Sequence, residues 1–135
     1  MTEFYMAMIP PTVTAQEKNI GTNKKTGKAF LYNSDEVKAA KAKLTAYLWQ
    51  YRPEKPYTTG VMLCVRWYFP RGKHPHGSYR ITKPDTDNLQ KLLKDCMTKC
   101  GFWKDDALVA SEHVEKLWGE IPGIWIRIEE LEAQL

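Results

Sequence analysis

The feature that most constrains the fold is an apolar repeat between residues 89 and 100. Apolar residues recur there at intervals of three and four, the spacing that lines one face of an α-helix; they are Leu89, Leu92, Leu93, Cys96, Met97 and Cys100. Pro84 and Asp85 stand where such a helix would begin, and Gly101 stands where it would end. The pattern therefore predicts a helix from Asp85 to Cys100 with one face in a core.

Carboxylates stand at both ends of this predicted helix. Asp85 and Asp87 belong to its first turn, where the helix dipole favours negative charge, and a second pair, Asp105 and Asp106, follows its end. Lys91 lies four residues after Asp87, on the side away from the apolar stripe. Spacing alone does not say whether the two acidic groups meet in space. If they do, they form a strongly acidic site with one lysine beside it.

Carboxylates held close together raise one another's pKa unless a cation joins them. Magnesium suits such a group, because it takes oxygen ligands and is commonly held by one or two carboxylates together with a substrate phosphate. The ion can activate a water against a phosphodiester, and Lys91 could neutralise the charge that develops. An alternative interpretation gives the same residues structural roles: Asp85 caps a helix, Asp87 and Lys91 form an exposed ion pair, and the second pair forms a turn.

Two segments of the chain carry a family resemblance. Residues 85–91 read DTDNLQK and residues 101–106 read GFWKDD, and together they resemble the signature of the RusA family of Holliday junction resolvases. Residues 113–116 and 122–128 also resemble the closing strands of that family. The resemblance is strongest over residues 83–130 and extends in layout over nearly the whole chain.

The resemblance implies a homodimeric, magnesium-dependent endonuclease that resolves four-way DNA junctions by paired symmetric nicks in recombination and repair, with manganese as the alternative ion. Its catalytic, metal-binding carboxylates correspond by position to Asp85, Asp87 and Asp106, and its catalytic lysine to Lys91. Asp105 is not expected to be a ligand. Pro84 is a departure, because some members carry a basic residue there, and Lys83 is expected to supply that charge instead.

Charge is divided unevenly along the chain. Before residue 84 there are 14 Lys and Arg against 5 Asp and Glu, whereas from residue 84 onward there are 6 against 11. The basic half is therefore expected to bind polymeric phosphate, with release of condensed counterions. Two glycine-containing segments that we expect to be mobile loops hold the predicted DNA-binding residues, which are Lys24, Lys25 and Lys28 in the first and Arg71, Lys73, Arg80 and Lys83 in the second. Any single one of them could equally be an ordinary solvated side chain.

Length and composition predict a single domain over residues 1–135. The chain is 43% hydrophobic, which is enough for one core, and no apolar run reaches the roughly 18 residues of a membrane span. The start of the chain lacks the pattern of a secretory signal, so we expect a cytoplasmic protein that does not bind membranes. Its three cysteines are expected to be buried free thiols.

The remaining patterns predict the scaffold. Strands are expected over residues 3–9 and 59–69, a helix over 34–51, and a pair of strands over 107–117 and 124–131. The strand over 59–69 alternates apolar residues on one face and is not simply polar on the other, which is typical of a central strand or of a subunit interface. The resulting order, β-α-β-α-β-β, predicts an α+β two-layer sandwich with a mixed sheet and the helices packed on one of its faces.

Two further functions compete with junction cleavage. One is an architectural protein that binds junctions without cutting, although a pure binder has no use for carboxylates beside a phosphate. The other is a magnesium-dependent enzyme acting on a small phosphorylated metabolite, which would require a phosphate cradle. No glycine-rich loop opens a helix in this sequence, so the second alternative has less support.

Overall fold

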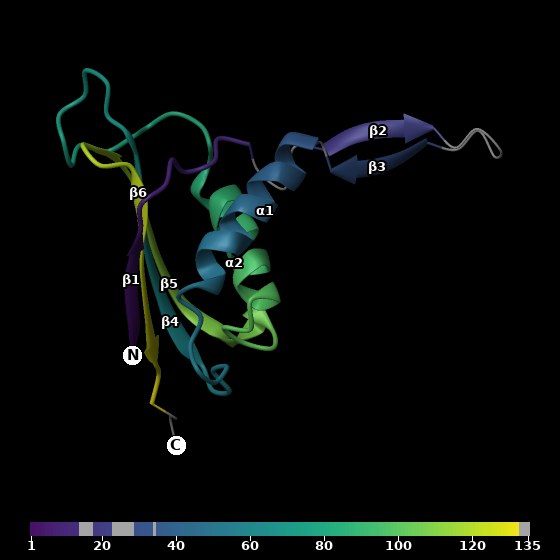
Figure 1. The fold of residues 1–135 in the computed structure, drawn as a ribbon, viewed down its shortest axis with the longest axis vertical. Helices are drawn as coiled ribbons and strands as arrows, with labels where there is room; N and C mark the ends of the chain where they lie inside the picture. The colour runs from purple at the N-terminus through teal and green to yellow at the C-terminus, as the bar shows by residue number, and fades with distance from the viewer. Residues whose placement is uncertain (14–17, 23–28, 34, 133–135) are drawn as a thin grey trace.

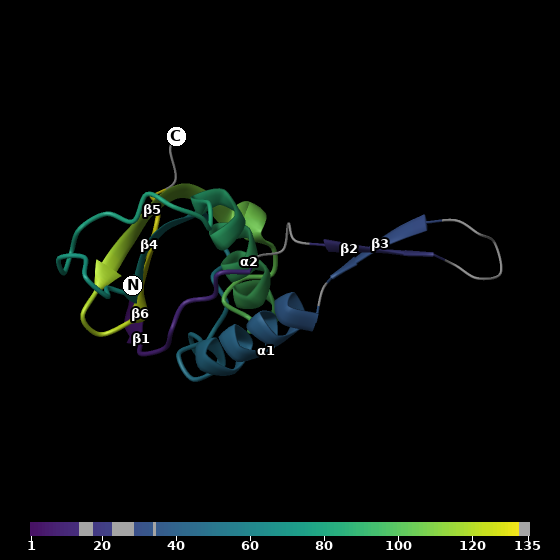
Figure 2. The ribbon, with the colours of Figure 1, turned by 90° about the horizontal axis from the view of Figure 1, so that it is seen from above.

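The computed structural model describes residues 1–13, 18–22, 29–33 and 35–132. Its main sheet has four strands in the order β1-β6-β4-β5, and the helices lie on one face of it (Figures 1 and 2). The strands are β1 (Thr2–Met6), β4 (Val61–Pro70), β5 (Val109–Gly119) and β6 (Gly123–Glu130), and the helices are α1 (Asp35–Trp49), α2 (Thr86–Lys99) and the short 3₁₀ helix η1 (Asp106–Leu108). The predicted α+β class with a mixed sheet is confirmed.

The core lies between the sheet and the two helices. Strand β4 points Val61, Leu63, Val65, Trp67 and Phe69 at the helices, and all five are buried. The apolar stripe of α2 meets them from the other side, since every residue of the predicted repeat is buried. This confirms the predicted amphipathic helix and the predicted inward face of β4.

The last two strands of the chain do not pair with each other. Strand β4 lies between them, parallel to β5 and antiparallel to β6. The prediction of a strand pair over 107–117 and 124–131 is therefore wrong. The reason is that α2 carries the chain back over the sheet and sets β5 beside β4 as a parallel neighbour, so the free edge of β4 is left for β6.

The N-terminal part differs from the prediction in two ways. The first strand ends at Met6 rather than at residue 9, where its pairing with Ile124 of β6 also ends. The segment expected to be a loop contains two strands, β2 (Lys18–Thr22) and β3 (Ala29–Asn33), which pair antiparallel in a separate sheet that stands apart from the main one (Figures 1 and 2). The predicted order β-α-β-α-β-β therefore lacks this two-stranded sheet.

In the part of the chain that the structure describes, no helix lies on the other face of the main sheet (Figure 2). Cys64 of β4 lies on this face and is half-buried, whereas Cys96 and Cys100 are buried in the core, and all three thiols are free. The prediction of three buried thiols is thus wrong for Cys64, because its strand has one face without a helical cover. Within the described residues, no helix combines the length and the apolar character that crossing a membrane requires.

Candidate active site

A pocket at the edge of the sheet gathers three of the four predicted catalytic residues. Asp87 and Lys91 reach it from α2, and Asp106 reaches it from the start of η1. The pocket has a volume of about 480 Å³ and is closed on the sheet side by Glu112 and Val114 of β5. The fold therefore brings the two ends of the predicted helix motif to one place, which spacing alone could not establish.

Asp85 stands at the entrance to α2. It is the N-cap residue, with extended backbone geometry, and its carbonyl oxygen accepts the first helical hydrogen bond, from the Leu89 N–H at 3.1 Å. Its carboxylate is exposed and makes no capping hydrogen bond. In the described part of the chain it is not among the residues that line the pocket, so the predicted fourth member of the site stands beside the pocket rather than in it.

The second acidic pair is fixed by a buried turn. Gly101 follows α2 with a φ of +83°, a value that favours glycine, and the Phe102 N–H bonds back to the carbonyl of Met97. Phe102 and Trp103 are buried, as predicted, and the indole N–H of Trp103 donates to the hydroxyl of Thr98 at 2.8 Å. The chain therefore enters the aspartate pair from an anchored position.

The two aspartates of this pair have different surroundings. The Asp105 carboxylate accepts a hydrogen bond from the Ala107 N–H at 2.9 Å and so caps η1. Asp106, which lines the pocket, is partly buried. A carboxylate that caps a helix has a structural role, which agrees with the expectation that Asp105 is not a ligand.

Three polar residues of the pocket were not identified from the sequence. Gln90 is 3% exposed, accepts a hydrogen bond from the indole N–H of Trp67 at 2.7 Å and donates one to the Glu112 carboxylate at 2.9 Å. Lys94 donates to the other oxygen of the same carboxylate at 3.2 Å. The network places a third carboxylate, held from two sides, in the pocket that contains Asp87 and Asp106.

The sequence carried a signal for one of these residues, Gln90. It stands three residues before Leu93 and seven before Met97, so it is a polar residue on the apolar face of the predicted helix. Glu112 alternates with Val114 along β5, but only the register of β5 with β4 shows that this face turns toward the helices. A polar residue at a position that a helical pattern assigns to the core could therefore have identified Gln90, but not Glu112.

The carboxylates offer the oxygen ligands that magnesium and manganese prefer. In the residues that the structure describes, however, no three histidine, cysteine, aspartate or glutamate side chains are gathered closely enough to hold a metal ion. The donor set therefore fits a hard divalent cation in its chemistry, but the described side chains do not form a preassembled cage. Such an ion would need water or substrate oxygens to complete its coordination.

The predicted DNA-binding residues fall into three groups. Lys24, Lys25 and Lys28 lie outside the described residues. Lys73 and Lys83 are exposed and leave their ammonium groups in solvent. Arg71 and Arg80 are engaged within the protein: the first pairs with Glu120 at 3.8 Å, and the second donates to the Lys83 carbonyl at 2.6 Å and lies over the rings of Phe69 and Trp118.

The segment that carries these residues follows the edge of β5. The Arg80 N–H donates to the Lys116 carbonyl at 2.9 Å, and the Trp118 N–H donates to the Ser78 carbonyl at 2.8 Å. The His74 ring is stacked on Trp118, with ring centres 4.1 Å apart. We expected a mobile loop here from its glycines, and the structure shows a segment bound to the sheet at several points.

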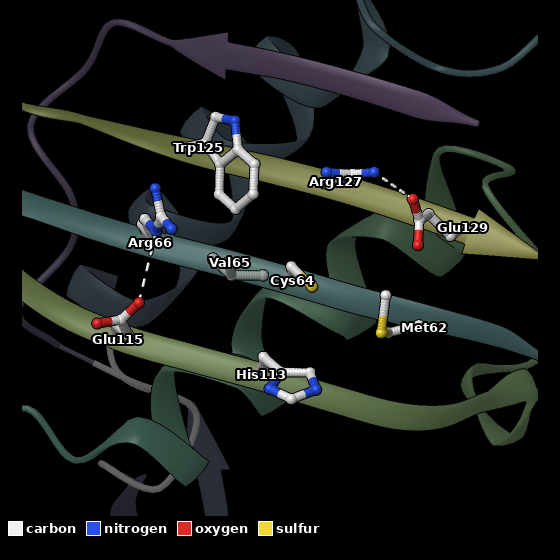
Figure 3. Close-up of a pocket in the computed structure, with 9 residues that line it drawn as sticks. All are labelled: Met62, Cys64, Val65, Arg66, His113, Glu115, Trp125, Arg127 and Glu129. Carbon is white, nitrogen blue, oxygen red and sulfur yellow. Dashed lines mark hydrogen bonds and ion pairs between the residues drawn. The ribbon is translucent and has the colours of Figure 1, made fainter.

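A second pocket lies on the sheet face that has no helical cover. Figure 3 shows its side chains standing out from β4, β5 and β6, with Cys64 and His113 in the middle. Arg66 pairs with Glu115, and Arg127 pairs with Glu129. Of the predicted catalytic and DNA-binding residues that the structure describes, none lines it, and its charges are nearly balanced, so its character differs from that of the acidic pocket on the helix side.

Comparisons with known proteins identify the family of this chain. The family model described as "Endodeoxyribonuclease RusA" matches residues 9–129. A protein of Lactococcus phage r1t named crossover junction endodeoxyribonuclease is 30% identical over 132 residues, which cover 96% of each chain. The Escherichia coli K12 protein named crossover junction endodeoxyribonuclease RusA is 54% identical over 33 residues, which are 24% of this chain and 28% of that one. The Bacillus subtilis protein YqaN is 29% identical over 81% of this chain and 84% of its own length. The resemblance predicted from the sequence is thereby confirmed, and the chain belongs to the RusA family of endodeoxyribonucleases.

Proposed function

We propose that this chain resolves four-way DNA junctions by paired symmetric nicks that depend on magnesium or manganese, in recombination and repair. The observation that carries the proposal is the pocket that brings Asp87 and Lys91 of α2 beside Asp106 of η1. Relatives named crossover junction endodeoxyribonuclease support the choice of substrate. The names give the class of reaction, and the pocket gives residues that could perform it.

Each residue has a proposed role. Asp85, Asp87 and Asp106 would hold the divalent ion, which when bound polarises the phosphodiester and lowers the pKa of an attacking water. The exposed Asp85 carboxylate, which makes no capping bond, is available for this role. Lys91 would lie next to the scissile phosphate and stabilise the negative charge that grows on it. Glu112 holds Lys94 at the pocket and so limits the positive charge that competes with the ion.

The DNA surface that we propose combines the exposed lysines with the acidic pocket. Lys73 and Lys83 would contact backbone phosphates on either side of the cut, together with Lys24, Lys25 and Lys28, and each contact should steepen the salt dependence of binding by about 0.9 on a log–log scale. We assign Arg71 and Arg80 a smaller part in DNA binding, because their guanidinium groups are already engaged within the protein.

A homodimer is part of the proposal. Two symmetric sites match the two-fold symmetry of a four-way junction and allow both opposed strands to be cut. The sheet face opposite the helices suits the contact between the copies, because it presents Trp125 and Tyr68 among balanced charges and lies away from the acidic pocket. Light scattering that gives the mass of a monomer at micromolar concentration, with and without a junction, would contradict this part.

Cleavage of a synthetic four-way junction tests the proposal directly. The wild-type chain should nick the junction symmetrically with magnesium and leave a linear duplex of the same sequence intact, and a chelator should abolish the reaction. Asp87→Asn should lose cleavage and keep junction binding, because the change removes an ionic metal ligand and also lessens repulsion of phosphate. Junction binding by the wild type without any nick would instead support the architectural alternative. If the wild type bound neither the junction nor the duplex, the result would support the other alternative, an enzyme that acts on a small phosphorylated metabolite.

A further inference from the structure

The segment that leads into Asp85 is held by side chains of two cations. The Lys116 ammonium donates to the carbonyl of Thr82 at 2.6 Å and to the carbonyl of Pro84 at 2.8 Å. The Arg80 guanidinium donates to the carbonyl between them, that of Lys83, at 2.6 Å. Three consecutive carbonyl oxygens before Asp85 therefore accept hydrogen bonds from charged donors, which are stronger than neutral ones.

The next carbonyl in the chain is that of Asp85, which accepts the first hydrogen bond of α2. The backbone from Thr82 to Asp85 is thus bound at four successive oxygens, while the Asp85 carboxylate makes no capping bond. A backbone fixed on both sides of a carboxylate that has no capping role is the arrangement expected where the carboxylate serves an external ligand.

Lys116 belongs to strand β5, and its side chain extends from the sheet to the backbone of residues 82–84. It stands on β5 opposite Trp67 of β4, on the face that turns toward the helices, and its side chain is partly buried. Burial and the neighbouring Arg80 lower the pKa of the Lys116 ammonium from its ordinary value, whereas the Asp85 carboxylate raises it. An ammonium in such a place is costly unless its donors are used, and two of its three donors are bound to the carbonyls named above.

Arg80 is fixed in the same way. Its guanidinium lies 4.3 Å from the ring centre of Phe69 and 4.8 Å from that of Trp118. Burial lowers the pKa of this group from its ordinary value. An arginine that contacts two rings and a carbonyl has little freedom left to meet a phosphate, so its contacts point to support of the backbone rather than to DNA binding.

We propose that Lys116 is a positioning residue for the divalent metal site, which it serves by holding the backbone that presents the Asp85 carboxylate, with Arg80 as its partner. The inference rests on the proposed function, because it takes Asp85 as a metal ligand. Lys116 itself contacts neither metal nor DNA in this role. Residues that orient a metal ligand without contacting the metal typically contribute about 10-fold to 100-fold to metal affinity, and we expect an effect of this size from Lys116.

The sign of the effect separates positioning from simple electrostatics. Removing a positive charge near a cation site should by itself tighten magnesium binding, because a repulsion is lost. Loss of positioning should weaken it. In Lys116→Met the two effects oppose each other, so weaker magnesium binding in this variant indicates that Lys116 acts through the backbone of Asp85.

The experiment is a magnesium titration of the DNA-free chain, followed through the backbone amide signals of Thr86 and Asp87, with wild type, Lys116→Met, Lys116→Arg and Lys99→Met. Lys99 is an exposed lysine in the last turn of α2, so it controls for the change in net charge. We expect Lys116→Met to raise the half-saturating magnesium concentration about 10-fold or more, Lys116→Arg to recover most of the loss, and Lys99→Met to match the wild type.

Amide hydrogen exchange on the same samples supplies a readout independent of metal. Exchange in Lys116→Met should rise within residues 80–86 and stay unchanged in β4 and β6. Unchanged or tighter magnesium binding, exchange that rises throughout the core, or no recovery by Lys116→Arg would each overturn the proposal. Absence of cleavage by the wild-type chain would refute the proposed function instead, since the titration does not depend on DNA being cut.

Discussion

Two aspartates precede helical turns in this chain and are used differently. Asp85 precedes α2 and makes no side-chain capping bond, whereas Asp105 precedes η1 and accepts the N–H of Ala107 at 2.9 Å. In sequence the two are equivalent, since each is an aspartate at a predicted helix or turn boundary. The comparison teaches that the capping bond, and not the residue type, separates a structural carboxylate from one that is available to a ligand.

The supports of the two positions differ as well. The backbone before Asp85 is held by cationic donors at the edge of the sheet, Lys116 and Arg80. The backbone before Asp105 follows Phe102 and Trp103, which are buried in the core. The position of Asp106 therefore depends on the stability of the whole fold, whereas that of Asp85 depends on a few polar contacts that a single substitution can remove.

The sharpest way to break this comparison is to neutralise each aspartate in turn. Asp85→Asn should lower junction cleavage on the order of 100-fold to 1,000-fold, because it removes an ionic ligand from the site of charge development. Asp105→Asn should stay within a few-fold of the wild type, since asparagine caps about as well as aspartate. Single-turnover cleavage at saturating enzyme measures both. Equal losses in the two variants would show that the capping bond does not distinguish them.

The next test concerns the hydrogen bond that links Gln90 of the acidic pocket to Trp67 in the core. Gln90→Leu should lower the free energy of unfolding by roughly 1 to 3 kcal/mol, because the buried indole N–H of Trp67 loses its acceptor. Urea unfolding measures the change. The single variant Trp67→Phe and the double variant Trp67→Phe with Gln90→Leu supply the control. The double variant removes both partners of the hydrogen bond, so its loss of unfolding free energy should be smaller than the sum of the losses in the two single variants. A loss equal to that sum would show that Trp67 and Gln90 are not coupled.

The parts of the fold that follow from local pattern could be predicted. Helix α2 was expected from Asp85 to Cys100 and extends from Thr86 to Lys99 with those two residues as its caps. The apolar spacing, the aspartate at one end and the glycine after the other are all read within one segment of chain. The inward face of β4 was predictable for the same reason, because alternation is also a local signal.

The parts that depend on distant partners could not be predicted. Strands β5 and β6 were expected to pair because they are consecutive, but their placement on either side of β4 depends on contacts far apart in sequence. Glu112 and Lys116 were missed because the inward face of β5 is defined only once its register with β4 is known. The resemblance to the RusA family identified the four candidate catalytic residues. The hydrogen bonds of Gln90, Lys94 and Glu112 around them could be found only from the structure.

A smaller effect is expected at Gly101, in the turn that leads from α2 to Asp105 and Asp106. Gly101→Ala should destabilise the chain by about 1 kcal/mol, because its φ of +83° places an added Cβ in the left-handed region. Nothing lies within 4 Å of such a Cβ, so the cost comes from the backbone and not from a clash. Thermal unfolding measures it. Gly101→Asn is the matched control and should cost less, since asparagine tolerates this conformation better; a larger loss for asparagine would contradict the explanation.

The smallest expected effect tests the opening comparison through stability alone. Asp105→Ala should cost about 0.5 to 1 kcal/mol, because the Ala107 N–H loses its acceptor at the start of η1. Asp85→Ala removes no capping bond, so its cost should be limited to the loss of the favourable helix-dipole interaction, a few tenths of a kcal/mol at ordinary salt. Added salt should erase the second cost and leave most of the first, because a dipole interaction is screened and a short hydrogen bond is not. Urea unfolding at low and high salt separates the two. If Asp85→Ala proved the more destabilising at high salt, the carboxylate would be a structural cap after all, and its assignment to the metal would lose its basis.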